Sequence, residues 1–175
     1  IRTQIINTCP AMTSLNDSVT EYKKQLDKGD IQIAYRGLIE YMMGLKTFFK
    51  RKYPDFLVPG SLYQGYMDMT YFALFPDDLK ERKLKIAIVL IHDKMKFEIW
   101  LSGINKQIQT KYWNMLKSKD IKVYHLPETL KGSDSIVEYS LAIDPDFNDP
   151  EALTRQIESG TLKFIKDIKG LIKAS

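Results

Sequence analysis

The alternation of hydrophobic and polar residues is clearest between residues 84 and 102, where it predicts a β-hairpin. The first arm, residues 84–92, is apolar at almost every position, as expected of a strand that is covered on both faces. The second arm, residues 95–102, alternates, so a two-residue turn would pair His92 with Met95. One face of this hairpin is then apolar, and the other mixes charge with a tryptophan. The second face carries Lys85, Lys96, Glu98, Trp100 and Ser102.

Apolar residues at helical spacing predict helices before and after this hairpin. A first helix is capped by Ser14 or Asn16 and stops at Gly29, and a second runs from Asp30 to about Lys52. Another helix follows Asn105, and a final helix begins at Pro150. The aromatic-rich residues 62–75 predict a strand, as do residues 121–126 and 135–143.

Together these elements predict one α+β domain with a mixed or antiparallel central sheet of about five strands, flanked by helices in the order α-α-β-β-β-α-β-β-α. A chain of 175 residues that is 44% hydrophobic is long enough for one sizeable core. Met12 stands just before the first predicted helix and suits a natural start. We therefore expect a domain over residues 12–175 and an N-terminal extension over residues 1–11.

Composition limits the classes of binding partner and the cellular compartment that the sequence supports. A net charge of +4 permits an acidic partner without demanding one, and gives only weak support for nucleic acid. The single Cys9 excludes an intramolecular disulfide and a multi-thiolate zinc site, and the two histidines match no metal-ligand spacing. No apolar run is long enough for a membrane span, and no leader is recognisable. These features predict a soluble, cytoplasmic protein with no membrane partner.

Asp68 is the residue of its predicted strand that a purely structural role explains least well. A carboxylate among aromatic residues and methionines needs a partner or solvent, because an unpaired buried charge is very costly. If its strand lies beside the hairpin, Asp68 would share a face with Glu98, near two lysines. Two such carboxylates can bind a divalent metal ion or carry out acid–base chemistry. A structural ion pair or a solvated sheet face explains the same residues without any site.

The aromatic residues of that face suggest a second use. Trp100 and Tyr66 would stack a planar ligand or a base, with polar groups from Arg36, Gln64, Thr70 and Ser102 fixing its orientation. The alternative without a ligand is that both rings only pack against the next helix. The sequence holds no phosphate-binding glycine loop, nucleophile elbow or cysteine–histidine pair at usable spacing, so we expect no cofactor.

Three segments together resemble a family of bacterial proteins that is catalogued as a domain of unknown function. The segments are residues 35–38 (YRGL), 63–71 (YQGYMDMTY) and 97–103 (FEIWLSG), the last followed by Asn105-Lys106. The resemblance covers nearly all of the chain after Met12 and implies no activity.

The order of elements in the middle of the chain is also similar to the core of the restriction-endonuclease-like superfamily. The signature of that superfamily places an acidic residue, one further residue and a lysine on the third strand. Here the corresponding triplet is Glu98-Ile99-Trp100, with tryptophan in place of the lysine, although Lys96 would point to the same face.

Our leading hypothesis is a non-catalytic binding or interaction module that uses the sheet face around Asp68, Glu98 and Trp100, with a small-molecule or protein partner. The alternative is a metal-dependent, phosphodiester-cleaving enzyme on a degenerate nuclease-like core, which requires one metal ion to reach both carboxylates. A purely structural subunit is the third class, and an extensive exposed apolar patch would indicate it. From the sequence, the question of enzyme activity stays open.

Overall fold

The computed structural model describes residues 14–119 and 121–173. These residues fall into two compact units, one that ends at Tyr41 and one that begins at Met42. The α+β class and the predicted order of the main helices and strands are confirmed. The predicted N-terminal extension lies outside the described residues. Within them, no helix has the length and apolar character needed to cross a membrane.

The first unit contains α1 (Leu15–Lys28) and the first part of α2 (Asp30–Lys52). The Ser14 hydroxyl accepts a hydrogen bond from the backbone N–H of Asp17, and the Asp17 carboxylate accepts one from the backbone N–H of Ser14. This capping box fixes the start of α1. Gly29 ends the helix in a left-handed conformation with φ at 83°, which glycine adopts at no steric cost.

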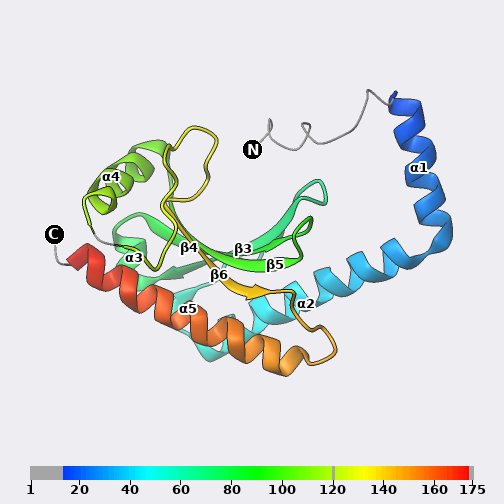
Figure 1. Cartoon of the computed structure of the whole chain (residues 1–175). Coiled ribbons are helices and arrows are strands. Elements are labelled where there is room, and N and C mark those ends of the chain that lie inside the picture. Colours follow the sequence, from blue (N-terminus) through cyan, green and yellow to red (C-terminus); the bar gives the residue numbers. More distant parts are fainter. Residues whose placement is uncertain (1–13, 120, 174–175) are drawn as a thin grey trace. The chain divides into compact units, whose positions relative to one another are not determined.

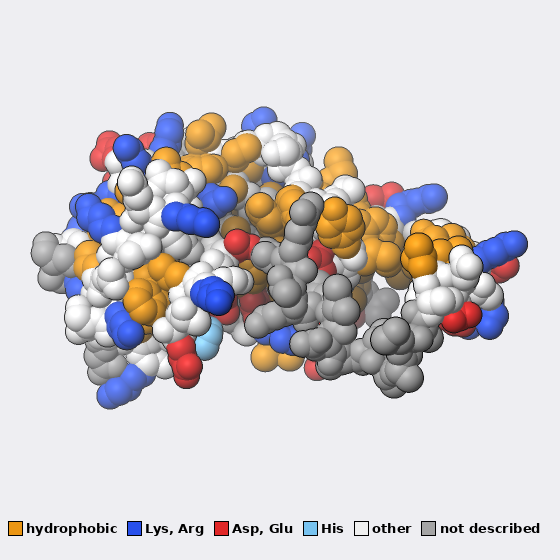
Figure 2. All heavy atoms as spheres, turned by 90° about the horizontal axis from the view of Figure 1, so that it is seen from above, with side chains coloured by type: hydrophobic (Ala, Val, Ile, Leu, Met, Phe, Trp, Pro, Cys, Tyr) orange, Lys and Arg blue, Asp and Glu red, His pale blue; other side chains and the backbone are white. Residues whose placement is uncertain are grey.

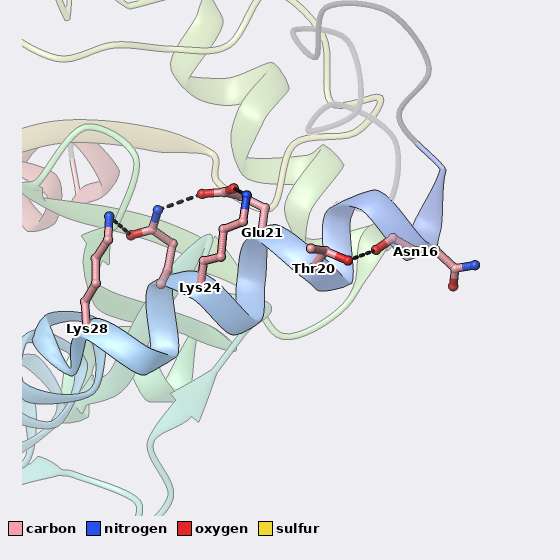
Figure 3. Close-up of polar contacts among 6 residues, drawn as sticks. Asn16, Thr20, Glu21, Lys24 and Lys28 are labelled. Carbon is pink, nitrogen blue, oxygen red and sulfur yellow. Dashed lines mark hydrogen bonds and ion pairs between the residues drawn. The ribbon is translucent and has the colours of Figure 1, made fainter.

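On one side of α1, polar side chains bind one another (Figure 3). Glu21 accepts a hydrogen bond from the side-chain amide of Gln25 at 2.7 Å and pairs with Lys24 at 3.5 Å. The Gln25 side chain in turn accepts from Lys28 at 3.3 Å. These contacts span three or four residues, as neighbours on one helix face do.

The second unit is built on an antiparallel sheet. Its strands are β1 (Phe56–Leu57), β2 (Tyr63–Gln64), β3 (Met69–Pro76), β4 (Leu84–Ile91), β5 (Lys96–Gly103) and β6 (Val137–Ile143). The order across the sheet is β1-β3-β4-β5-β6, and β2 also pairs with β3. Between β4 and β5 the register joins Ile91 to Lys96 and Ile86 to Leu101, so the predicted hairpin is confirmed with its predicted pairing.

Helices cover one face of this sheet (Figure 1). α5 (Pro150–Lys173) and the part of α2 from Met42 onward lie along that side. Phe49 of α2 is fully buried, with its ring 6.2 Å from that of Phe72 on β3. Phe164 of α5 is also fully buried. The apolar face predicted for the hairpin supplies the rest of this core, through Ile86, Ile88, Leu90, Phe97, Ile99 and Leu101.

Two smaller helices complete the unit. α3 (Asp77–Glu81) joins β3 to β4, and α4 (Lys106–Lys117) follows β5. The Asn105 side chain accepts a hydrogen bond from the backbone N–H of Ile108 at 3.0 Å, which confirms the predicted cap of α4. Gly103 lies so close to α4 that an added Cβ would be 2.6 Å from the backbone nitrogen of Gln109. A larger residue at Gly103 would therefore push α4 away from the sheet.

Two strand predictions were wrong in detail. Residues 62–75 do not form one strand, because a turn at residues 65–68 separates β2 from β3, and Met67 adopts a positive φ of 61° there. Residues 121–126 form no regular strand. Only His125 makes a bridge, exchanging two backbone hydrogen bonds with Glu138 on β6. Because β6 is an edge strand, this bridge covers part of its free edge.

Candidate functional site

The sheet face opposite α5 carries the candidate site. Residues that are paired across an antiparallel sheet point to the same side, and neighbours along a strand point to opposite sides. The register pairs Glu98 with Val89 and Val89 with Tyr71, so these three side chains share a face. We name it the Glu98 face. It is formed by Met69, Tyr71, Ala87, Val89, Ile91, Lys96, Glu98 and Trp100.

The floor of the Glu98 face is apolar. Met69, Ala87 and Val89 are buried, and the partly exposed Tyr71, Ile91 and Trp100 pack against them. The Tyr71 ring stacks on that of Tyr63 from β2, with 4.8 Å between ring centroids and 25° between planes. Burial, and to a lesser extent the neighbouring Tyr63 and Asp134, raise the pKa of Tyr71 above its ordinary value, so its hydroxyl stays protonated.

Glu98 introduces a charge into this apolar surface. Its side chain is only 10% exposed, and both carboxylate oxygens have partners. Oε1 pairs with Lys96 Nζ, and Oε2 accepts a hydrogen bond from the indole Nε1 of Trp100 at 2.7 Å. Lys96, Glu98 and Trp100 alternate along β5, which is why one strand presents all three to the same side. The burial of the carboxylate is therefore compensated, and the indole is held in a fixed orientation.

A loop closes the far end of this face. The Ser102 hydroxyl, predicted as a ligand group, donates a hydrogen bond to the backbone oxygen of Asp134 at 2.8 Å. The buried Ser135 hydroxyl donates to the Glu138 carboxylate and also contacts the Ser133 hydroxyl at 3.1 Å. Ser102 is paired with Lys85 across β4 and β5. Within the described residues, the Ser102 hydroxyl thus anchors the loop rather than facing an open site.

Hydrophobic and charged side chains meet on this side of the protein. In the view from above, hydrophobic side chains lie next to acidic ones, with lysine and arginine side chains nearby (Figure 2). In Figure 1, α5 and the part of α2 from Met42 onward run along the other side of the sheet, and α4 lies toward the end of β5 that is far from the β4–β5 turn. Among the described elements of the second unit, no helix is drawn over the hairpin end of the Glu98 face.

The structure does not bring Asp68 to this face. The backbone oxygen of Asp68 accepts a hydrogen bond from the backbone N–H of His92, which continues the register that pairs Thr70 with Leu90. Thr70 therefore lies on the helix-covered side, opposite Glu98, whereas Asp68 precedes β3 and its Oδ1 accepts a hydrogen bond from the backbone N–H of Met69 at 2.8 Å. The shared face expected if the strand of Asp68 lay beside the hairpin does not follow from this register, which buries Thr70, Phe72 and Leu74.

The remaining predicted residues are also scattered. Gln64 pairs with Thr70 and so lies on the side away from Glu98. Tyr66 is 89% exposed in the turn between β2 and β3. Arg36 is an exposed residue of α2 in the first unit. Of the predicted set, the structure places on the Glu98 side Lys85, Lys96, Glu98, Trp100 and Ser102.

Sequence reasoning missed Tyr71 and Met69 as members of this face, and Tyr63, whose ring stacks on that of Tyr71. A single strand over residues 62–75 would place Gln64, Asp68 and Thr70 on one face and these three residues on the other. A signal was present: continuing the alternation from Thr70 to Phe72 and Leu74 gives an apolar row that suits the core. The buried Thr70 belongs to that row and binds His92, with 2.9 Å between Thr70 Oγ1 and His92 Nε2.

The pair of Thr70 and His92 predicts a pH dependence of stability. Burial lowers the pKa of His92 below its ordinary value, and the carboxylates of Asp68 and Asp93 act in the opposite direction. The unfolded chain, with a histidine pKa of about 6.5, therefore binds more protons than the folded chain just below that pH. The free energy of unfolding should fall as the pH is lowered from about 6.5 through the folded pKa of His92.

Urea unfolding between neutral and mildly acidic pH measures this dependence. His92→Gln keeps a side chain that can bind Thr70, and should remove the decline in this window. His125→Gln, at an exposed position, serves as the control and should retain it. An equal decline in all three proteins would contradict the assignment to His92.

No set of three or more histidine, cysteine, aspartate or glutamate side chains in the described ranges is placed to hold a metal ion. The model of a family described as a domain of unknown function, DUF7000, matches residues 15–172, which is most of the chain. No curated protein and no solved structure matches the chain. The predicted resemblance to the restriction-endonuclease-like superfamily is therefore not confirmed.

Proposed function

We propose that this chain, which belongs to the DUF7000 family, is a non-catalytic binding module whose Glu98 face holds a planar aromatic small molecule. The observation that carries the proposal is the hydrogen bond from Trp100 Nε1 to Glu98 at 2.7 Å. It holds the polar edge of the indole against Glu98, two residues away on the same strand, and fixes the ring plane. A fixed, partly exposed ring is a surface on which a flat ligand can stack.

The neighbours of Trp100 support this proposal. Tyr71, stacked on Tyr63, gives a second aromatic surface on the same face. The apolar floor of Met69, Ala87 and Val89 would lie under the ligand, as apolar residues line most small-molecule sites. The Lys96 ammonium has donors beyond the one that pairs with Glu98, so it can supply a donor at the ligand's edge, and polar groups of this kind fix the orientation of a ligand.

The same geometry gives the enzyme alternative less support. Its metal ion needs both Asp68 and Glu98, and the register of β3 with β4 gives no support for a face shared by the two carboxylates. Both oxygens of Glu98 are already bonded within the protein. A general acid or base needs a group that can reach the substrate, and Glu98 would have to leave Lys96 and Trp100 to do so.

Tryptophan fluorescence tests the proposal directly. The chain has two tryptophans, so Trp113→Phe leaves Trp100 as the sole reporter. Nucleobases, nucleosides and free flavin are the probes, and at least one should change the emission of Trp100 in a saturable way. Loss of the stack in Trp100→Leu should weaken binding, measured by calorimetry, by about 5- to 150-fold, because stacking on an aromatic side chain is worth about 1–3 kcal/mol.

Lys94→Ala, at an exposed position in the β4–β5 turn, is the matched control and should bind like the parent protein. Failure of every probe to bind, or unchanged affinity in a folded Trp100→Leu protein, would refute the proposal.

A further inference from the structure

Helix α1 carries a row of exposed hydrophobic side chains. Leu15, Val19 and Tyr22 are 78%, 53% and 56% exposed, and α1, which is described throughout, buries none of its residues. Together with Leu26 they follow one another at steps of four, three and four residues, which places them on one side of the helix. Exposed apolar rows of this length are uncommon on monomeric proteins and mark interaction surfaces.

The other side of the same helix is polar. Glu21, Gln25 and Lys28 bind one another, as does Glu21 with Lys24 (Figure 3). The Thr20 hydroxyl donates a hydrogen bond to the backbone oxygen of Asn16 at 2.8 Å. Among the described residues, these polar side chains find partners within the helix, and the side chains of Leu15, Val19 and Tyr22 are exposed.

We propose that this row binds the same row of a second copy of the chain, with the two α1 helices antiparallel. The steps of four, three and four residues read the same in both directions. A reversed copy therefore presents hydrophobic residues at matching heights, with Leu15 opposite Leu26 and Val19 opposite Tyr22. This is the self-complementarity that a two-fold symmetric interface requires.

The charges of α1 favour the antiparallel arrangement over the parallel one. The first half of the helix contains two acidic residues and no basic one, whereas the second half contains three lysines and one aspartate. These residues are Asp17, Glu21, Lys23, Lys24, Asp27 and Lys28. An antiparallel pair sets a half of net charge −2 against a half of net charge +2, and a parallel pair sets like against like. The helix dipoles are also opposed in the antiparallel pair.

The interface is small, which sets the expected strength. A helix of 14 residues is about 21 Å long, so one helix pair buries less surface than a standard protein interface. We therefore expect a reversible dimer with a dissociation constant on the order of 10–100 µM.

Sedimentation velocity of the full chain across that concentration range tests the proposal. The weight-average mass should rise from monomer toward dimer. Val19→Glu places a charge in the row and should weaken the dimer at least about tenfold. Thr20→Glu adds the same charge one residue away, on the polar side, and should leave the dimer largely intact. A wild-type protein that stays monomeric, or equal effects of the two variants, would overturn the proposal.

Disulfide trapping tests the direction of pairing. In a Cys9→Ser background, chains with Leu15→Cys and chains with Leu26→Cys should form a mixed disulfide when combined, and neither should cross-link with itself. Cysteines can be joined only when their Cα atoms lie within about 7 Å, so the pattern reports which residues are opposite. Self-linked Leu15→Cys chains would instead show a parallel pair and refute the antiparallel model.

Discussion

Phe49→Ala should lower the free energy of unfolding by about 4 kcal/mol, because truncating a buried phenylalanine removes its transfer free energy and leaves a cavity. Phe49 is 0% exposed and lies between α2 and the sheet. Its ring is 6.2 Å from that of Phe72 and 5.8 Å from that of Tyr53. These neighbours belong to separate elements, so they cannot readily collapse together into the space that is left.

Urea unfolding followed by circular dichroism measures this loss. Lys50→Ala is the matched control, since the neighbouring side chain is exposed and its removal should change stability by less than about 0.5 kcal/mol. A loss below about 1.5 kcal/mol for Phe49→Ala would mean that the packing of α2 from Met42 onward against the sheet is not as described.

Lys96→Met should destabilise the protein by about 3 kcal/mol, because it leaves the Glu98 carboxylate buried without its cation. The Lys96 and Glu98 side chains are 22% and 10% exposed, so solvent can replace the lost partner only in part. The hydrogen bond from Trp100 to the other carboxylate oxygen remains and keeps the loss near the lower end for a broken buried pair.

The double variant Lys96→Met/Glu98→Gln separates charge from packing. It removes both charges and retains an amide oxygen for Trp100, and should recover most of the stability lost by Lys96→Met. Thermal unfolding of the wild type, the two single variants and the double variant forms a cycle whose interaction free energy reports the pair. If the double variant were as unstable as the sum of the two single variants, the ion pair would have no energetic role.

The candidate site was predictable only where one hairpin contains it. Lys96, Glu98 and Trp100 lie on one strand, and their shared side follows from alternation alone. The β4 residues that lie beside them follow from the two-residue turn at Asp93-Lys94, which sets the register of the hairpin. The side of Asp68 was not predictable in this way, because Asp68 precedes β3 and the pairing of β3 with β4 passes through α3, with no short turn to fix it.

The sequence by itself determined the helix limits and the β4–β5 hairpin. Ser14 and Gly29 bound α1, and Asn105 and Pro150 precede or begin α4 and α5, as predicted. These signals act over three or four residues, so the local chain suffices to produce them. The choice of turn in the hairpin is equally local.

The tertiary structure decided which side of β3 enters the core and whether residues 121–126 pair as a strand. Both outcomes depend on contacts between residues far apart in the chain. The buried row of β3, with Phe72 against Phe49, outweighs the cost of burying Thr70, whose hydroxyl is compensated by His92. Residues 121–126 lie along the free edge of β6 and make only the single bridge at His125 there.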